Sequence, residues 1–177
     1  GVAASGNAGF GLNLVQARSG TATANLAAVA GVGNAGYGLG ILQMESGLAM
    51  AMVGGSLASG NAAGGILVQQ VDNLIGLANI SGSAANGNVL DGIALGQDSQ
   101  MLSIGLIGVA DGLGTTVSGL AGMIGFPLPA EVAMFLQPTG PVTTIGNGGN
   151  GVVAIAQADL LALGGYFDIA AIGNGLD

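Results

Sequence analysis

The sequence contains no cysteine and no histidine, and charged residues make up only 6% of its 177 positions. Without cysteine there are no disulfides and no thiol nucleophile, and without either residue the common zinc sites are excluded. Nine acidic residues stand against one base, Arg18, so the net charge is -8. So few cations cannot neutralise a phosphate backbone, which argues against nucleic acid as a partner.

Aromatic residues are also scarce, at 3%, although half of the chain is hydrophobic and 37 residues are glycine. An ordinary globular domain has about a quarter of its residues charged. A surface with so little charge is poorly protected against self-association. Helices are disfavoured, because each interior glycine costs about 1 kcal/mol relative to alanine.

What the sequence does contain is a strict 27-residue repeat, which opens on Gly-Asn and closes on Gln. A fixed period of this length is typical of solenoids. Between the two ends of the motif, apolar residues alternate with small or polar ones, as Leu12 and Leu14 do around Asn13, which predicts a strand. The amide positions of the first four repeats are Asn7, Asn34, Asn61 and Asn88, with Gln16, Gln43, Gln70 and Gln97.

The repeat returns near the end of the chain, with Asn147, Asn174 and Gln157. One extra residue separates Asn147 from Gln157, which suggests a β-bulge. All four prolines lie between positions 127 and 141, where the chain is expected to leave the sheet, with a short helix at 130–136. The expected coils are 5–31, 32–58, 59–85, 86–112, a degenerate coil 113–144 that carries the proline-rich excursion, 145–171, and a partial coil 172–177.

These patterns predict one all-β repeat domain over residues 1–177, a β-solenoid of about six coils stacked in a cross-β-like manner. Coils about 4.8 Å apart would place identical residues above one another. Stacked Asn and Gln side chains can then form amide ladders, and all eleven amide residues named above are candidate ladder and assembly residues. For the asparagines, plain turn chemistry is an open alternative.

Charged residues gather at one expected corner of the coil, at Arg18, Glu45, Asp72 and Asp159, with Ser99 continuing the column. A solvated corner is the favoured interpretation, and Ca²⁺ bound by stacked carboxylates is the alternative. No other cofactor is expected. Because no pocket residues support acid-base work by these carboxylates, we do not expect an enzyme.

The longest weakly polar stretch, residues 101–126, contains Asp111 and several hydroxyl residues and continues the repeat. We therefore read it as solenoid rather than as a membrane-spanning helix, and membrane contact is not expected. A chain that starts at Gly1 fits a mature product after removal of a signal peptide, which favours an extracellular or cell-surface location.

The stretch from Gly33-Asn34-Ala35 to Gln43 resembles the repeats of bacterial functional amyloids, the curlin and Fap families. Its spacing is three residues longer than in curlin, and the period is longer too. The resemblance implies a secreted subunit that stacks with itself into β-solenoid fibres of a biofilm matrix or cell-surface coat. The alternatives are a solenoid adhesin that binds a ligand or surface, and a glycine-rich membrane-associated protein.

Overall fold

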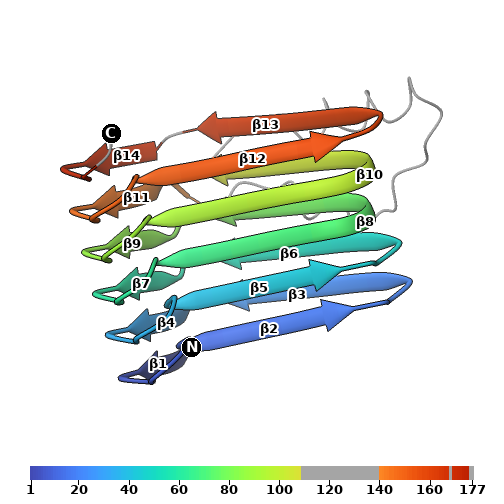
Figure 1. The fold of residues 1–177 in the computed structure, drawn as a ribbon. Coiled ribbons are helices and arrows are strands. Elements are labelled where there is room, and N and C mark those ends of the chain that lie inside the picture. The colour runs from blue at the N-terminus through green and yellow to red at the C-terminus, as the bar shows by residue number, and fades with distance from the viewer. Residues whose placement is uncertain (109–139, 168, 176–177) are drawn as a thin grey trace.

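The computed structural model describes residues 1–108, 140–167 and 169–175, which form a flat stack of parallel coils (Figure 1). Over the first four coils each step advances the chain by 27 residues, because Leu12 pairs with Leu39, Leu39 with Ile66 and Ile66 with Ile93. The all-β solenoid expected from the repeat is confirmed. Five front strands stack in chain order, so the solenoid has about five turns.

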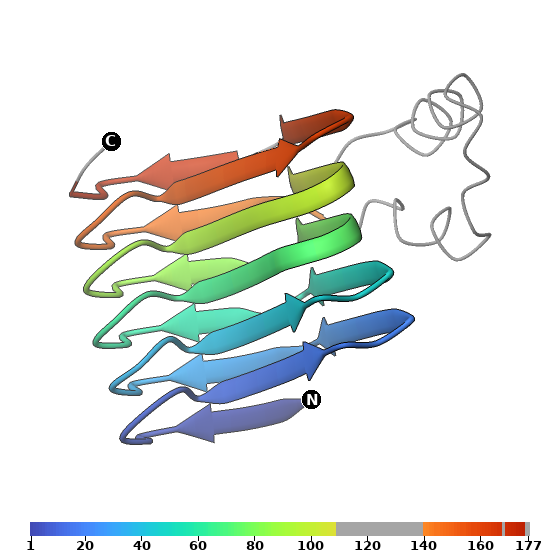
Figure 2. The same ribbon diagram turned by 45° about the vertical axis from the view of Figure 1, so that its right-hand side comes forward.

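Each coil consists of a front strand and a back strand, joined at one corner of the stack (Figures 1 and 2). In two coils the strand bends through the corner without a break, so a single eight-stranded sheet forms both layers. The front strands are β2 (Leu12–Ala17), β5 (Leu39–Met44) and β12 (Val152–Ala158), the back strands are β3 (Thr21–Ala27), β6 (Leu48–Gly54) and β13 (Leu161–Phe167), and the continuous strands are β8 (Ile66–Ser81) and β10 (Ile93–Gly108).

A third, short strand completes each coil beyond the end of the back strand. This segment is rich in small residues, and the repeat pattern by itself did not predict a strand between the back strand and the next Gly-Asn. The short strands form their own six-stranded parallel sheet, so each coil has three strand segments. They are β1 (Val2–Ser5), β4 (Val29–Val32), β7 (Leu57–Ser59), β9 (Ala84–Asn86), β11 (Val142–Ile145) and β14 (Ile169–Ile172).

The main hydrophobic core lies between the front and back layers. Strand β3 shows why the chain folds this way, since alternate residues along it are buried and exposed. Leu39 and Ile66 from the front strands meet Val53 and Ile80 from the back strands in this core, and all four are fully buried. Burying each such side chain contributes about 1.5–3 kcal/mol.

The other face of the back layer is also apolar. In β6, Ala49 and Ala51 point into the main core, so Met50 between them lies on the opposite face. This half of the repeat thus places its small residues on the inner face and its large residues on the outer face. The large residues form a second buried cluster: Met50, Ile75, Leu77, Leu102, Ile104 and Leu106.

The stack passes directly from β10 to β12, since Ile93 pairs with Val152. Strand β9 likewise pairs directly with β11. The prediction that residues 113–144 form a coil between them is therefore wrong, because parallel strands that pair with each other leave no room for a layer. The helix expected at 130–136 lies outside the described residues. Within the described ranges, no helix is long and apolar enough to span a bilayer.

Candidate functional site

The Gly-Asn motif occupies the loop between each short strand and the next front strand. Its glycine has a positive φ in every coil, from 60° at Gly173 to 67° at Gly6. A residue with a Cβ is strained in this conformation, which explains the invariant glycine of the repeat. The asparagine that follows points into the stack, and Asn34, Asn61 and Asn88 are at most 2% exposed.

The asparagines form a continuous ladder along the stack. Asn61 Oδ1 accepts hydrogen bonds from the backbone N–H of Asn34 and from its Nδ2, both at 3.0 Å. Asn61 Nδ2 donates in turn to Asn88 Oδ1 at 2.8 Å and to the Gly31 carbonyl at 3.1 Å. The side-chain ladder runs through Asn7, Asn34, Asn61, Asn88, Asn147 and Asn174. These residues therefore act both as turn residues and as ladder members.

The glutamines form a second ladder inside the solenoid, between the two layers. Gln43 Nε2 donates to Gln16 Oε1 at 2.8 Å, Gln70 to Gln43 at 2.8 Å, and Gln97 to Gln70 at 2.6 Å. Each Nε2 also donates to a carbonyl of the back strand, as Gln70 does to Leu77 at 2.9 Å. The glutamine ladder thus connects neighbouring coils and also ties the front layer to the back layer.

The two ladders run in opposite directions. Each asparagine amide donates toward the coil that follows it in the chain, whereas each glutamine amide donates toward the coil that precedes it. The boundary between two coils therefore has a side-chain donor and a side-chain acceptor on each side. This arrangement fixes the register, because a one-residue slip of a strand would turn its inward side chains to the opposite face.

Gln157 is not part of the glutamine ladder, so the prediction that it continues the column is wrong. Strand β12 pairs with β10 without a bulge, which places Ala156 beside Gln97 and Gln157 beside Asp98. The extra residue after Asn147 therefore shifts Gln157 onto the outer, exposed face of the front layer. The ladder ends at Gln97, whose buried Oε1 has no hydrogen-bond partner among the described residues.

The charged corner lies at the turn between front and back strands, as expected. Arg18, Glu45 and Asp72 all have a positive φ, between 51° and 56°. Arg18 Nε lies 2.9 Å from Glu45 Oε2, with side chains 80% and 53% exposed, and a surface pair of this kind contributes little stability. The described residues contain no group of three or more acidic side chains that could hold a metal ion.

Ser99 does not continue the charged column, contrary to expectation. The register between β8 and β10 shifts at the corner, so Ser99 pairs with Asn73 rather than with Asp72. Ser99 is consequently buried, at 3% exposed. The change follows from the register, because Asp72 is an extra residue of β8 without a partner in β10, so Ser99 takes the place beside the buried Asn73. Asp159, in contrast, is exposed in the corner between β12 and β13.

Serine and asparagine residues at other positions make shorter ladders that the sequence analysis missed. The backbone N–H of Val29 donates to Ser56 Oγ, and that of Ser56 to Ser83 Oγ, both at 3.2 Å. At the corner, the backbone N–H of Ser46 donates to Asn73 Oδ1 at 2.9 Å. The signal was available, because Ser56 and Ser83 are one repeat apart.

The edges of the stack expose backbone groups in a regular pattern. The N–H of Leu12 donates to the Gly38 carbonyl of the next coil at 3.0 Å, and Ile93 bonds Gly151 in the same way. Because backbone groups alternate along a parallel strand, Ala154 and Ala156 of β12 direct theirs away from β10. Val15 of β2 directs its backbone groups away from β5 by the same alternation. Among the described strands, β2 and β12 are outermost in the front layer.

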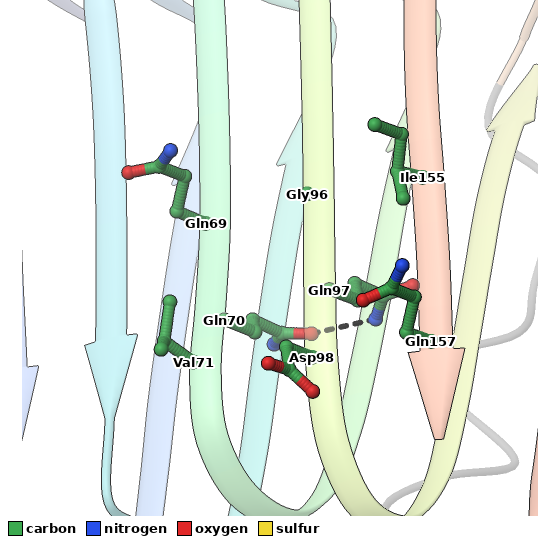
Figure 3. A pocket seen from close by; sticks show the side chains of 8 residues that line it. All are labelled: Gln69, Gln70, Val71, Gly96, Gln97, Asp98, Ile155 and Gln157. Atoms are coloured by element: carbon green, nitrogen blue, oxygen red, sulfur yellow. Dashed lines mark hydrogen bonds between the residues drawn. The ribbon is translucent and has the colours of Figure 1, made fainter. Parts of the chain in front are cut away.

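A shallow hollow of about 200 Å³ lies on the outer face of the front layer. It lies over Gly96, which has no side chain, between Val71 and Ile155 (Figure 3). Asp98 and Gln157 add polar groups to its lining. The hollow offers one carboxylate and amide groups on an apolar floor, but no second titratable group that could act with Asp98 in acid-base catalysis.

Two aromatic rings stack on the loop side of the front layer. The ring centroids of Phe10 and Tyr37 are 5.8 Å apart, at an interplanar angle of 22°. Burial raises the pKa of Tyr37 above its ordinary value, and the nearby Asp91 carboxylate raises this pKa further. Asp91 Oδ1 accepts a hydrogen bond from the backbone N–H of Asn150 at 2.8 Å. This cluster lies outside both amide ladders.

No protein-family model, curated protein or solved structure matches this chain. What the structure shows is a β-solenoid of 27-residue coils with buried asparagine and glutamine ladders.

Proposed function

We propose that this protein is a structural subunit that stacks end to end with copies of itself, so that the coils continue from one subunit into the next as a filament. The asparagine ladder carries this proposal. It repeats the same donors and acceptors at every coil boundary from Asn7 to Asn174. Each coil is thus a template for the next, and a second copy brings a first coil that matches it.

The first and last coils have complementary side chains for such a junction. Continuing the observed register would place Leu12 of one subunit on Val152 of another, and Leu14 on Ala154. Leu12 is larger than Val152 and Leu14 is larger than Ala154. The side chains of the first coil can therefore fill the space beside the smaller side chains of the last coil. At this junction β1 and Asn7 of the incoming copy would take the place on β11 and Asn147 that β14 and Asn174 hold in the free subunit, so the last short strand has to move aside.

Charge supports the same head-to-tail arrangement. Strands β2, β3, β12 and β13 contain no charged residue and no proline, although these are the residues that protect natural sheet edges from pairing. Arg18, the only base of the chain, lies at the corner of the first coil, and Asp159 lies at the corner of the last. Stacking would bring the two close together.

The proposed role needs no catalytic group, cofactor, nucleic acid or membrane. Its partner is a second copy of this chain. We place the filament outside the cell or at its surface, because the lack of cysteine and the low charge fit an extracellular polymer, as does the resemblance to curlin and Fap repeats.

The first test is direct observation of assembly. Purified protein in plain buffer should form filaments that are visible by negative-stain electron microscopy. An aligned specimen should give a meridional reflection near 4.8 Å, the spacing of stacked strands. Protein that remains monomeric at concentrations of hundreds of micromolar would contradict the proposal.

A second test uses one blocked variant for each end. Ala156→Pro removes an N–H that points away from the stack in β12, and Val15→Pro does the same in β2, so neither variant loses a bond within its own subunit. Proline is tolerated at such edge positions. Each variant alone should stay monomeric. An equimolar mixture should form a heterodimer and stop there, because only one pair of unblocked ends remains. Filaments from either variant alone would rule out this junction.

A further inference from the structure

Tyr166 lies at the C-terminal end of the stack, in a position that belongs to the main core. It pairs with Ile107, which is buried between the two layers. The same column contains Leu26, Val53 and Ile80 in the earlier coils. Because strand residues alternate between faces, Tyr166 is directed to the inside of the solenoid, yet it is 52% exposed. Its ring therefore lies at the open level of the last coil.

The hydroxyl of Tyr166 reaches across this level to the front layer, where it donates to the Ala154 carbonyl at 3.1 Å. The surrounding inward positions are small, so the ring has room to cross. A Cβ built on Gly164, two residues before Tyr166, would meet no atom within 4 Å. The chain thus fills its last coil with one large side chain laid over small ones.

The Ala154 carbonyl, which accepts from Tyr166, is also the acceptor that the front strand of a stacked second copy would use. The Ala154 carbonyl points away from β10, by the alternation established at Leu12 and Ile93. In a stacked second copy, the backbone N–H of Val15 would donate to this same carbonyl. The Tyr166 hydroxyl and the incoming strand therefore compete for one acceptor.

We propose that Tyr166 is a built-in cap that controls addition of a second copy to the C-terminal end. This inference rests on the proposed end-to-end assembly. In the free subunit the ring covers the end of the core and its hydroxyl occupies the edge carbonyl. When a second copy adds, the hydrogen bond from the Tyr166 hydroxyl to the Ala154 carbonyl breaks, and the backbone N–H of the incoming Val15 donates to that carbonyl instead. The Tyr166 ring then packs in the apolar column beneath Leu26 of the incoming copy.

The blocked variants provide the test, because their heterodimer has a single junction. Only the Val15→Pro subunit contributes its C-terminal end to that junction. Tyr166→Phe in the Val15→Pro subunit keeps the ring but removes the hydrogen bond that must be broken, so Kd should fall about five-fold, the factor expected for one net hydrogen bond. Tyr166→Leu, which matches the aliphatic column, should lower Kd at least as far.

The same Tyr166→Phe change in the Ala156→Pro subunit is the matched control, since the C-terminal end of that subunit is not used, and Kd should not change. Kd would be measured by sedimentation velocity, with circular dichroism to show that each variant is folded. A heterodimer whose Kd is the same with Tyr166 or Phe in the Val15→Pro subunit overturns the cap and leaves end-to-end assembly standing. Absence of a heterodimer in every combination overturns both. A heterodimer that forms only with Tyr166→Phe or Tyr166→Leu supports the cap.

Discussion

Gln97 and Ala156 occupy equivalent positions in neighbouring coils, and the glutamine ladder stops between them. Gln97 Nε2 donates to Gln70 Oε1 at 2.6 Å, but its own Oε1 is buried and has no hydrogen-bond partner in the described part of the chain. A buried acceptor without a partner costs about 1–3 kcal/mol. The last coil therefore leaves unsatisfied a group that each earlier coil supplies with a donor.

Replacing Ala156 with glutamine should repair the ladder. The new amide would donate to Gln97 Oε1 as Gln97 donates to Gln70, and we expect the free energy of unfolding to rise by about 1 kcal/mol. Urea denaturation would measure the change. Ala156→Met is the control, because it adds similar volume without a donor. Equal stabilisation by both substitutions would show that filling space, rather than the hydrogen bond, is responsible.

The asparagine ladder should be most sensitive in its middle. Asn61→Ala would leave buried groups of Asn34, Asn88 and Gly31 without their partners, and we expect a loss of about 3 kcal/mol or more. Asn7→Ala removes only the first, exposed member of the ladder, so its loss should stay below about 1 kcal/mol. The comparison requires the urea midpoints of both variants. Similar losses at both positions would refute the idea that buried partners dominate the cost.

Two glycines should respond differently to alanine, because they are needed for different reasons. At Gly60, where φ is +63°, a Cβ would meet no atom within 4 Å, so only the backbone strain of about 1 kcal/mol is expected. At Gly38 a Cβ would lie 2.6 Å from Asn61 Nδ2 and 2.8 Å from the Gly31 carbonyl. Gly38→Ala should therefore displace the ladder and cost about 3 kcal/mol. Thermal denaturation of the two variants would measure both losses of stability. A larger loss for Gly60→Ala than for Gly38→Ala would contradict this prediction.

Tyr37 should make stability fall at high pH. Burial, and to a lesser extent Asp91, raises the pKa of Tyr37 in the folded state, so the unfolded chain loses this proton first as the pH passes about 10. Ionisation of Tyr37 therefore leaves the free energy of unfolding unchanged below about pH 10. It lowers this free energy as the pH rises from there to the pKa of the folded state. Urea denaturation between pH 8 and 11 should show a smaller decline for Tyr37→Phe than for the parent chain. Parallel declines in the two proteins would count against the shift.

Some features of the structure could be predicted from the sequence alone, and others could not. The 27-residue period determined the coil, the parallel register and the first four asparagines and glutamines of the ladders, because stacked coils place residues one period apart beside one another. The positive φ of Gly6 and Gly60 followed from glycine at a fixed loop position. The same reasoning failed at Gln157, since the spacing to Asn147 did not show whether the extra residue forms a bulge or shifts the strand.

Other features depended on the tertiary structure. Nothing in the repeat pattern indicated that β10 pairs directly with β12 across a long insertion, or that Ser99 is buried beside Asn73. Each outcome depends on strand pairing between residues far apart, where the hydrogen bonds of a whole strand outweigh one local preference. Tyr166 is the clearest case. Alternation predicts that its side chain points inward, but only the last level of the stack, with small residues around it, lets the ring cross to Ala154.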